Sequence, residues 1–129
     1  MRSPVLFSAL FSTAIVLAIL HISALNFYLY WIFPWLDLVA HMLGGIALGF
    51  LYLLTPLFIK GMPDRYITLA GLLSFVFIVG LVWEIFEIQI GLPNFYEYDF
   101  YIRDLYLDLL FDGVGGLIAF FVGSRLKDL

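Results

Sequence analysis

The chain has 129 residues, of which 64% are hydrophobic and only 12% are charged. Soluble domains carry a charge on about a quarter of their residues, so this composition excludes an ordinary soluble fold and predicts an integral membrane protein in contact with lipid. Cysteine is absent, which excludes disulfides and thiolate metal ligands. The formal net charge of -4, with no basic cluster, predicts no binding to nucleic acid.

Four apolar runs follow one another along the chain, at about 5–25, 36–59, 67–90 and 105–122. Each is long enough to cross a ~30 Å hydrocarbon core as a helix. We therefore expect a single all-α transmembrane domain over residues 1–129, folded as a four-helix bundle. The first run follows Arg2, as a signal peptide would, but it is longer than a typical signal core and lacks a small-residue cleavage site. We expect it to be retained as a span.

The connections between the runs differ in their chemistry. Residues 26–35 and 91–103 are rich in Tyr, Phe and Trp, which gather at membrane surfaces, whereas 60–65 is a short polar turn. If four helices alternate in direction, only Arg103 lies on the side away from the termini, and five basic residues lie on the other side: Arg2, Lys60, Arg65, Arg125 and Lys127. The positive-inside rule then predicts cytoplasmic N- and C-termini, in an inner or plasma membrane.

The second and fourth runs share a pattern that aligns without gaps, DLVAHMLGG at 37–45 and DLLFDGVGG at 108–116. In each, an acid is followed four residues later by His or Asp and then by a Gly pair. Both runs point in the same direction, so we expect two helical hairpins related by a pseudo-twofold axis along the membrane normal, as in transporters with parallel repeats. The glycines predict close helix packing, and their faces could also join two copies as a homo-oligomer.

Ionisable residues gather toward the predicted outer ends of three runs. Counted inward at ~1.5 Å per residue, they lie from about zero to about 12 Å deep. A charge facing lipid at such depths costs about 3 kcal/mol, so we expect these groups to face one another, water or a bound cation. Their spacing of three or four residues puts each set on one helix face: Asp37 and His41; Glu84 and Glu87; Asp104, Asp108 and Asp112.

A divalent cation is one way to make this layer tolerable. Six carboxylates and one imidazole have only Arg103 as a nearby basic residue, and like charges repel strongly in a low dielectric. We predict a metal site formed by Asp37, His41, Glu84, Glu87, Asp108 and Asp112. Oxygen-rich ligation with one nitrogen suits Mn, Fe, Zn, Mg or Ca. A proton-sharing network and a hydrated cation pathway remain open.

Three motifs, in order, resemble the VanZ-like membrane proteins and the related YjdF-like group. They are D-x-x-x-H at 37–41, W-E-I-F-E at 83–87, and R-D followed by D-x-x-x-D-x-x-G over 103–115. The chain has Leu38, Glu87 and Asp112 where VanZ-like proteins usually have Lys, Gln and Asn, so it is more similar to the YjdF-like branch. The resemblance implies a link to cell-envelope lipids and glycopeptide-antibiotic resistance, and it implies no particular reaction.

Three functions fit these residues. The leading hypothesis is a metal-binding protein. It extends to an enzyme on a lipid-linked or envelope substrate, in which Glu84 or Glu87 serves as the catalytic general base. The alternatives are a proton- or ion-coupled transporter and a noncatalytic membrane subunit or assembly factor. His21 is expected to be a hydrogen-bonded packing residue or an interfacial one, and Arg103 to pair with an adjacent acid.

Overall fold

The structure is a computed structural model that describes residues 4–91 and 98–126. Its described part is helical, and four of its helices are long and apolar enough to cross a membrane. This confirms the predicted membrane bundle. The elements are α1 (Pro4–Asn26), the single-turn α2 (Leu29–Ile32), α3 (Trp35–Phe58), the 3-10 turn η1 (Asp64–Tyr66), α4 (Leu69–Ile90) and α5 (Tyr98–Leu126).

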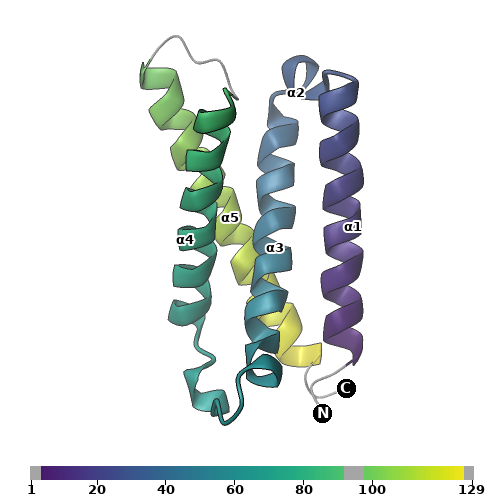
Figure 1. The fold of residues 1–129 in the computed structure, drawn as a ribbon, viewed down its shortest axis with the longest axis vertical. Helices are drawn as coiled ribbons and strands as arrows, with labels where there is room; N and C mark the ends of the chain where they lie inside the picture. Colours follow the sequence, from purple (N-terminus) through teal and green to yellow (C-terminus); the bar gives the residue numbers. More distant parts are fainter. Residues whose placement is uncertain (1–3, 92–97, 127–129) are drawn as a thin grey trace.

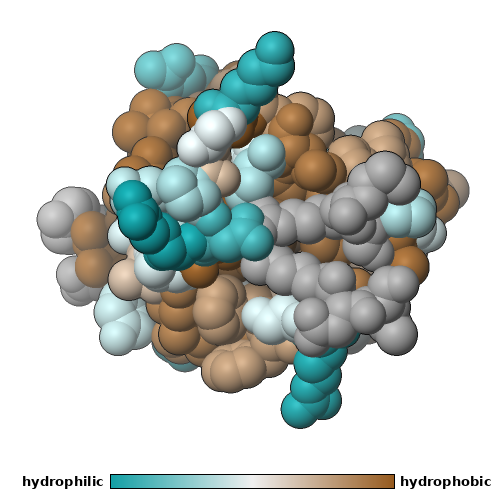
Figure 2. Space-filling view, turned by 90° about the horizontal axis from the view of Figure 1, so that it is seen from below, coloured by the Kyte–Doolittle hydropathy of each residue, from teal (hydrophilic) through white to brown (hydrophobic). Residues whose placement is uncertain are grey.

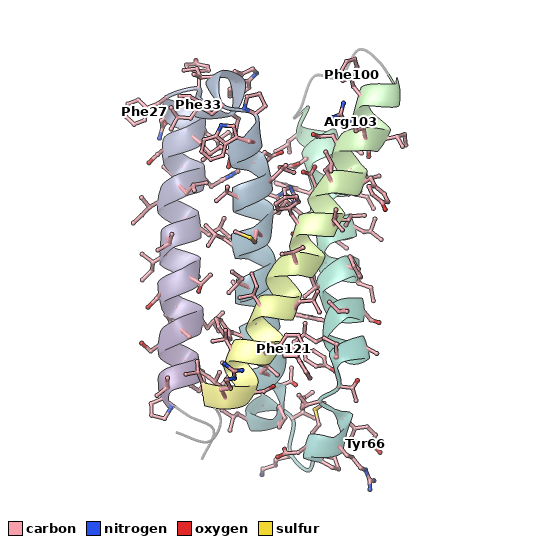
Figure 3. All side chains as sticks on the ribbon, turned by 180° about the vertical axis from the view of Figure 1, so that it is seen from behind. Phe27, Phe33, Tyr66, Phe100, Arg103 and Phe121 are labelled. Atoms are coloured by element: carbon pink, nitrogen blue, oxygen red, sulfur yellow. The ribbon has the colours of Figure 1, made fainter. Side chains whose placement is uncertain are left out.

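The long helices run up and down the bundle, and α5 crosses obliquely behind α3 and α4 (Figure 1). We call the end that carries Pro4, Leu126 and η1 the lower end, and the end that carries α2 the upper end. Figure 2 looks onto the lower end, where hydrophilic residues project while hydrophobic atoms dominate the flanks. Phe27 and Phe33 lie at the upper end (Figure 3), and both are exposed, as expected for aromatic residues at a membrane surface.

Helix ends agree with the apolar runs to within two residues except in α5, which starts earlier and ends four residues later, at Leu126, than its run. This helix already begins at Tyr98, although the apolar run begins only at 105. Polar residues do not prevent a helix from forming, so hydropathy alone placed its start too late. Local signals set the ends of α4: the Thr68 hydroxyl accepts a hydrogen bond from the Gly71 amide at 3.0 Å, and Gly91 closes the helix with a left-handed φ of 77°. Residues 92–97 lie outside the described part of the chain.

The closest helix pair is α3 and α5, which pack backbone to backbone. A Cβ atom added to Gly45 would collide with the Asp112 carbonyl oxygen, and one added to Gly115 would collide with the Met42 carbonyl oxygen. The predicted packing role of these glycines is therefore confirmed within the chain, whereas association of two copies through them stays a prediction. Helix α1 packs on α3 and α4 packs on α5, an arrangement compatible with two hairpins, and duplication remains a prediction.

The interior is divided into two layers. In the lower half, seven apolar side chains form one buried cluster: Leu6, Phe50, Leu53, Leu54, Leu72, Val76 and Ala119. In the upper half, the buried side chains are largely ionisable. Helix α1 is peripheral, because only its residues Leu6 and Ala24 are buried. The ionisable layer is therefore enclosed by α3, α4 and α5.

Candidate functional site

The ionisable layer is built around His41 of α3, whose residue is 7% exposed. Its Nδ1 atom lies 3.2 Å from Asp112 Oδ1, and its Nε2 atom lies 3.5 Å from Glu84 Oε1 and 3.8 Å from Asp108 Oδ1. All three carboxylates are buried. Side chains from three helices therefore meet at one imidazole, as the shared depth of the residues predicted.

The helix geometry explains why both ring nitrogens have an acidic neighbour. Asp108 and Asp112 are four residues apart, so they lie on one face of α5, one turn above the other. The close approach of α3 and α5 brings that face against His41. Gly80 of α4 supplies the remaining space, because a Cβ atom there would lie 2.5 Å from Asp112 Oδ2. The absence of a side chain on α4 thus makes room for a carboxylate from α5.

The two contacts of the imidazole differ in kind. The 3.2 Å separation between Nδ1 and Asp112 Oδ1 is a hydrogen bond, in which an ionised carboxylate accepts from the Nδ1–H group. The separations of 3.5 and 3.8 Å from Nε2 are too long for hydrogen bonds. In the neutral tautomer with the proton on Nδ1, the lone pair of Nε2 would point toward Glu84 and Asp108. In metal-binding histidines, one ring nitrogen usually binds the metal, and the other donates a hydrogen bond to a carboxylate that fixes the orientation of the ring.

Three carboxylate oxygens in this layer are buried without a hydrogen-bond partner among the described residues: Glu84 Oε1, Asp108 Oδ1 and Asp112 Oδ2. An unsatisfied buried acceptor costs about 1–3 kcal/mol, and more when it is charged. Two of these oxygens face the same ring nitrogen. The layer is therefore short of positive charge or protons at one identifiable point, beside His41 Nε2.

The other predicted ligands surround this point. Asp37, His41 and Asp108 can each offer a ligand atom within 4.8 Å of the others, and the same holds for His41, Glu84 and Glu87. Both groups share His41. The six predicted ligands thus comprise two overlapping groups together with Asp112, which holds the ring. Asp104, half-buried, belongs to neither group.

A cavity of about 390 Å³ lies beside the layer, between α1, α3 and α4. Its walls are mostly apolar, but Asp37, His41, Glu87 and Asp112 reach it. Glu84 does not line the cavity, although it is three residues from Glu87. The two glutamates that the sequence proposed as catalytic therefore occupy different places, one deep in the layer and one at the cavity wall.

Aromatic and imidazole groups form the upper wall of the cavity. Trp83 Nε1 donates a hydrogen bond to Glu87 Oε1 at 2.9 Å, and His21 Nδ1 lies 2.7 Å from the Tyr30 hydroxyl. Burial, and then the charges of Asp37 and Glu87, raise the pKa of Tyr30 above its ordinary value. His21 is thus hydrogen-bonded, as expected, but its place on the cavity wall could not be read from the sequence, because it depends on how α1 packs.

Arg103 lies near the upper end of α5 (Figure 3) and is exposed. It makes no ion pair with any described side chain, so the expected pairing with Asp104 is not found. The side chain of Asp99, the other expected partner, lies outside the described residues. The buried acids therefore receive no guanidinium charge within the described part of the chain.

Comparison with known proteins agrees with the membrane fold. A model of the family described as "Predicted membrane protein (DUF2238)" matches residues 1–129, the full length of the chain. No curated protein and no solved structure matches it. The family description names no reaction. It also does not mention the VanZ-like or YjdF-like proteins that the motifs resemble.

Proposed function

We propose that this chain, which belongs to the DUF2238 family of predicted membrane proteins, binds a divalent metal ion beside His41 Nε2. The observation that carries the proposal is the pair of buried carboxylate oxygens of Glu84 and Asp108 that face this nitrogen and accept no hydrogen bond from a described residue. Ligand atoms bound at about 2.1 Å to one ion lie about 3.0–3.4 Å apart. The separations of 3.5 and 3.8 Å from Nε2 need only small side-chain movements to reach that range, whereas Glu84 and Asp108 must also move closer to each other, because they belong to different groups of ligand atoms within 4.8 Å.

Each residue has a separate role in this proposal. His41, Glu84 and Asp108 are the ligands, and Asp37 completes the group from the cavity side. Asp112 orients the imidazole through Nδ1. One nitrogen among carboxylate oxygens suits Mn, Fe or Zn better than Mg or Ca, which prefer oxygen alone.

Catalysis is the second part of the proposal, with the cavity as the substrate site. A bound divalent ion would supply Lewis-acid activation there. Glu87 lines the cavity and is oriented by Trp83, so it is placed to act as general base, whereas Glu84 is buried behind it as a ligand. The apolar walls exclude water from the reacting group. A lipid-linked or envelope substrate would occupy this cavity.

The transporter alternative receives less support. Below His41 the interior is filled by the apolar cluster of the lower half, in which Leu53, Leu54, Leu72 and Val76 are fully buried. An ion leaving the site downward would have to cross this layer without polar partners, at a cost of many kcal/mol. A noncatalytic subunit would not need the ionisable layer to remain charged or metal-loaded. Substitution of His41 would leave such a role intact, but it would abolish the metal binding proposed here.

Metal analysis of the purified protein tests the proposal. After titration with Mn²⁺, Fe²⁺ or Zn²⁺ and removal of excess ion, we expect one ion per chain in the wild type. His41→Gln and Glu84→Gln are expected to lose it, because each removes a ligand from the centre. Asp64→Asn, a carboxylate substitution at the lower end, is the matched control and is expected to retain it. A wild-type protein that is folded but retains no ion would overturn the proposal.

A further inference from the structure

The cavity beside the ionisable layer is elongated along the helices. On α3 its walls extend from Asp37 to Leu48, and on α1 from His21 to Ala14. Eleven residues of helix correspond to about 16 Å, so the cavity reaches from near the upper end to the middle of the membrane. Small residues such as Ala18 and Ala47 give it its width.

The walls change in character along this length. The upper part presents His21, Asp37, His41 and Glu87, which can bind a polar or charged group. The lower part is lined by Ala14, Leu17, Ala47, Leu48 and Val79, which offer only hydrocarbon. The order is polar at the membrane surface and apolar toward the centre. A lipid of the adjacent leaflet has the same order from head group to chain end.

The cavity lies next to lipid. Its opposite walls are α1 and α4, which pack little against each other and meet at the upper end through the rings of His21 and Trp83, whose centroids are 6.0 Å apart. Beside it, Ile19 of α1 and Ile78 of α4 are both 62% exposed, so bilayer chains surround these helices in a membrane. The lower part of this cavity of about 390 Å³ is lined by hydrocarbon, so it is unfavourable for water and loses dispersion contacts if it is empty. A hydrocarbon chain from the bilayer is therefore a more favourable occupant than water, and it restores the contacts that an empty space would lack.

We propose that this cavity is the binding site for a single-chain lipid amphiphile of the upper leaflet, which enters between α1 and α4. Its chain lies along Ala14, Ala47 and Val79, and its polar group lies beside Asp37 and Glu87. The volume falls within the ~300–1,000 Å³ of typical small-molecule sites. The contacts of the lipid's hydrocarbon chain do not require a metal. Recognition of the lipid's polar group next to a cation, in contrast, rests on the proposed function.

Photo-crosslinking in phosphatidylcholine vesicles tests this site. The probes are three amphiphiles with one hexadecyl chain carrying a diazirine near its end, and with a phosphate, hydroxyl or trimethylammonium group at the head. We expect the crosslinking yield on Leu17, Leu48 and Val79 to be about tenfold the yield on the exposed Ile19 and Ile78. A tenfold ratio corresponds to a preference of ~1.4 kcal/mol of the probe for the cavity over the surrounding bilayer. Comparable yields on both sets would refute the site. The head group with the highest yield identifies the polar chemistry.

Three replacements of alanine by leucine distinguish cavity binding from general lipid contact. Ala47→Leu places a larger side chain in the cavity and is expected to reduce the crosslinks by about tenfold. Ala70→Leu makes the same change at an exposed position of α4 outside the cavity and is expected to leave them unchanged. Ala14→Leu repeats the test from the α1 wall. Undiminished crosslinks in both cavity variants, with each protein folded, would overturn the proposal.

Metal content, measured on the same samples, separates this inference from the proposed function. Ala47→Leu is expected to retain the ion, because it leaves His41 and its acids untouched. His41→Gln is expected to lose the ion and to keep the crosslinks made by the hydrocarbon chain. A wild-type protein that binds no metal but gives the cavity crosslinks would refute the metal proposal alone, and a wild-type protein that binds metal without cavity crosslinks would refute the lipid site alone.

Discussion

Replacing Gly80 by alanine tests the part of the site where the surface of α4 makes room for a carboxylate of α5. The new methyl group would lie 2.5 Å from Asp112 Oδ2, and real Cβ atoms essentially never approach closer than 3.0 Å. The carboxylate must therefore retreat by about half an ångström, or α4 must shift. Retreat of the carboxylate disturbs the 3.2 Å hydrogen bond to His41, which is already at the limit for such a bond, and a shift of α4 moves Glu84 relative to His41.

The expected result is a loss of metal affinity with the fold preserved. Disturbing the partner of a ligand histidine typically lowers metal affinity by about 10–100-fold, or ~1.4–2.7 kcal/mol. Overpacking costs about 1–3 kcal/mol of stability, and the better helix propensity of alanine offsets about 1 kcal/mol of this. Metal titration with a competing chelator gives the affinity, and thermal unfolding in detergent gives the stability.

Gly116→Ala is the matched control for this experiment. Its methyl group would lie 3.2 Å from Leu72 and 3.3 Å from Val76, so the crowding is with apolar side chains alone. We expect a small change in stability and no change in metal affinity. An unchanged affinity in Gly80→Ala, or an equal loss in both variants, would refute the reasoning that Asp112 acts through His41.

Three further predictions follow from the fold. Gly45→Ala is expected to lower stability by about 1–3 kcal/mol or more, because its methyl group meets the backbone of α5 rather than a movable side chain; unfolding in detergent measures this, and stability equal to that of the wild type would contradict the close packing. The Tyr30 phenol is expected to ionise above the ordinary pH range of tyrosine, because burial raises its pKa; an alkaline ultraviolet titration compared with Tyr30→Phe would show it, and a normal titration would count against this burial. Single cysteines introduced at Lys60 and Phe100 of this cysteine-free chain should react with a membrane-impermeant thiol reagent from the cytoplasmic and the outer side, respectively; the reverse pattern would invert the proposed orientation.

Hydropathy and helical spacing were sufficient to predict the bundle and the meeting of the acids. The spacing of Asp108 and Asp112 puts both on one face of α5, and membrane energetics require such a face to point inward. The Gly pairs predicted close packing, which the contact of Gly45 with α5 confirms. These inferences succeed because they depend on one helix at a time and on the cost of charge in lipid.

The sequence could not predict which atoms pair. The different environments of the two ring nitrogens of His41 depend on the rotation of α3 against α5, and no pattern within one helix records that rotation. The assignment of Glu87 to the cavity and Glu84 to the interior depends on the position of α1, as does the place of His21. The early start of α5 was missed because its first turns are polar and only the apolar run was counted.

The division of the interior into an ionisable upper half and an apolar lower half has an electrical consequence. His41 is six residues from the start of α3, about 9 Å along the helix, or roughly a third of the way through a ~30 Å core. An elementary charge that crosses the whole core exchanges about 2.3 kcal/mol per 100 mV. A divalent ion arriving from the upper surface would thus gain or lose about 1.4 kcal/mol per 100 mV, close to a tenfold change in occupancy. If the upper end faces the positive side, the resting voltage of the cell would help to load the site.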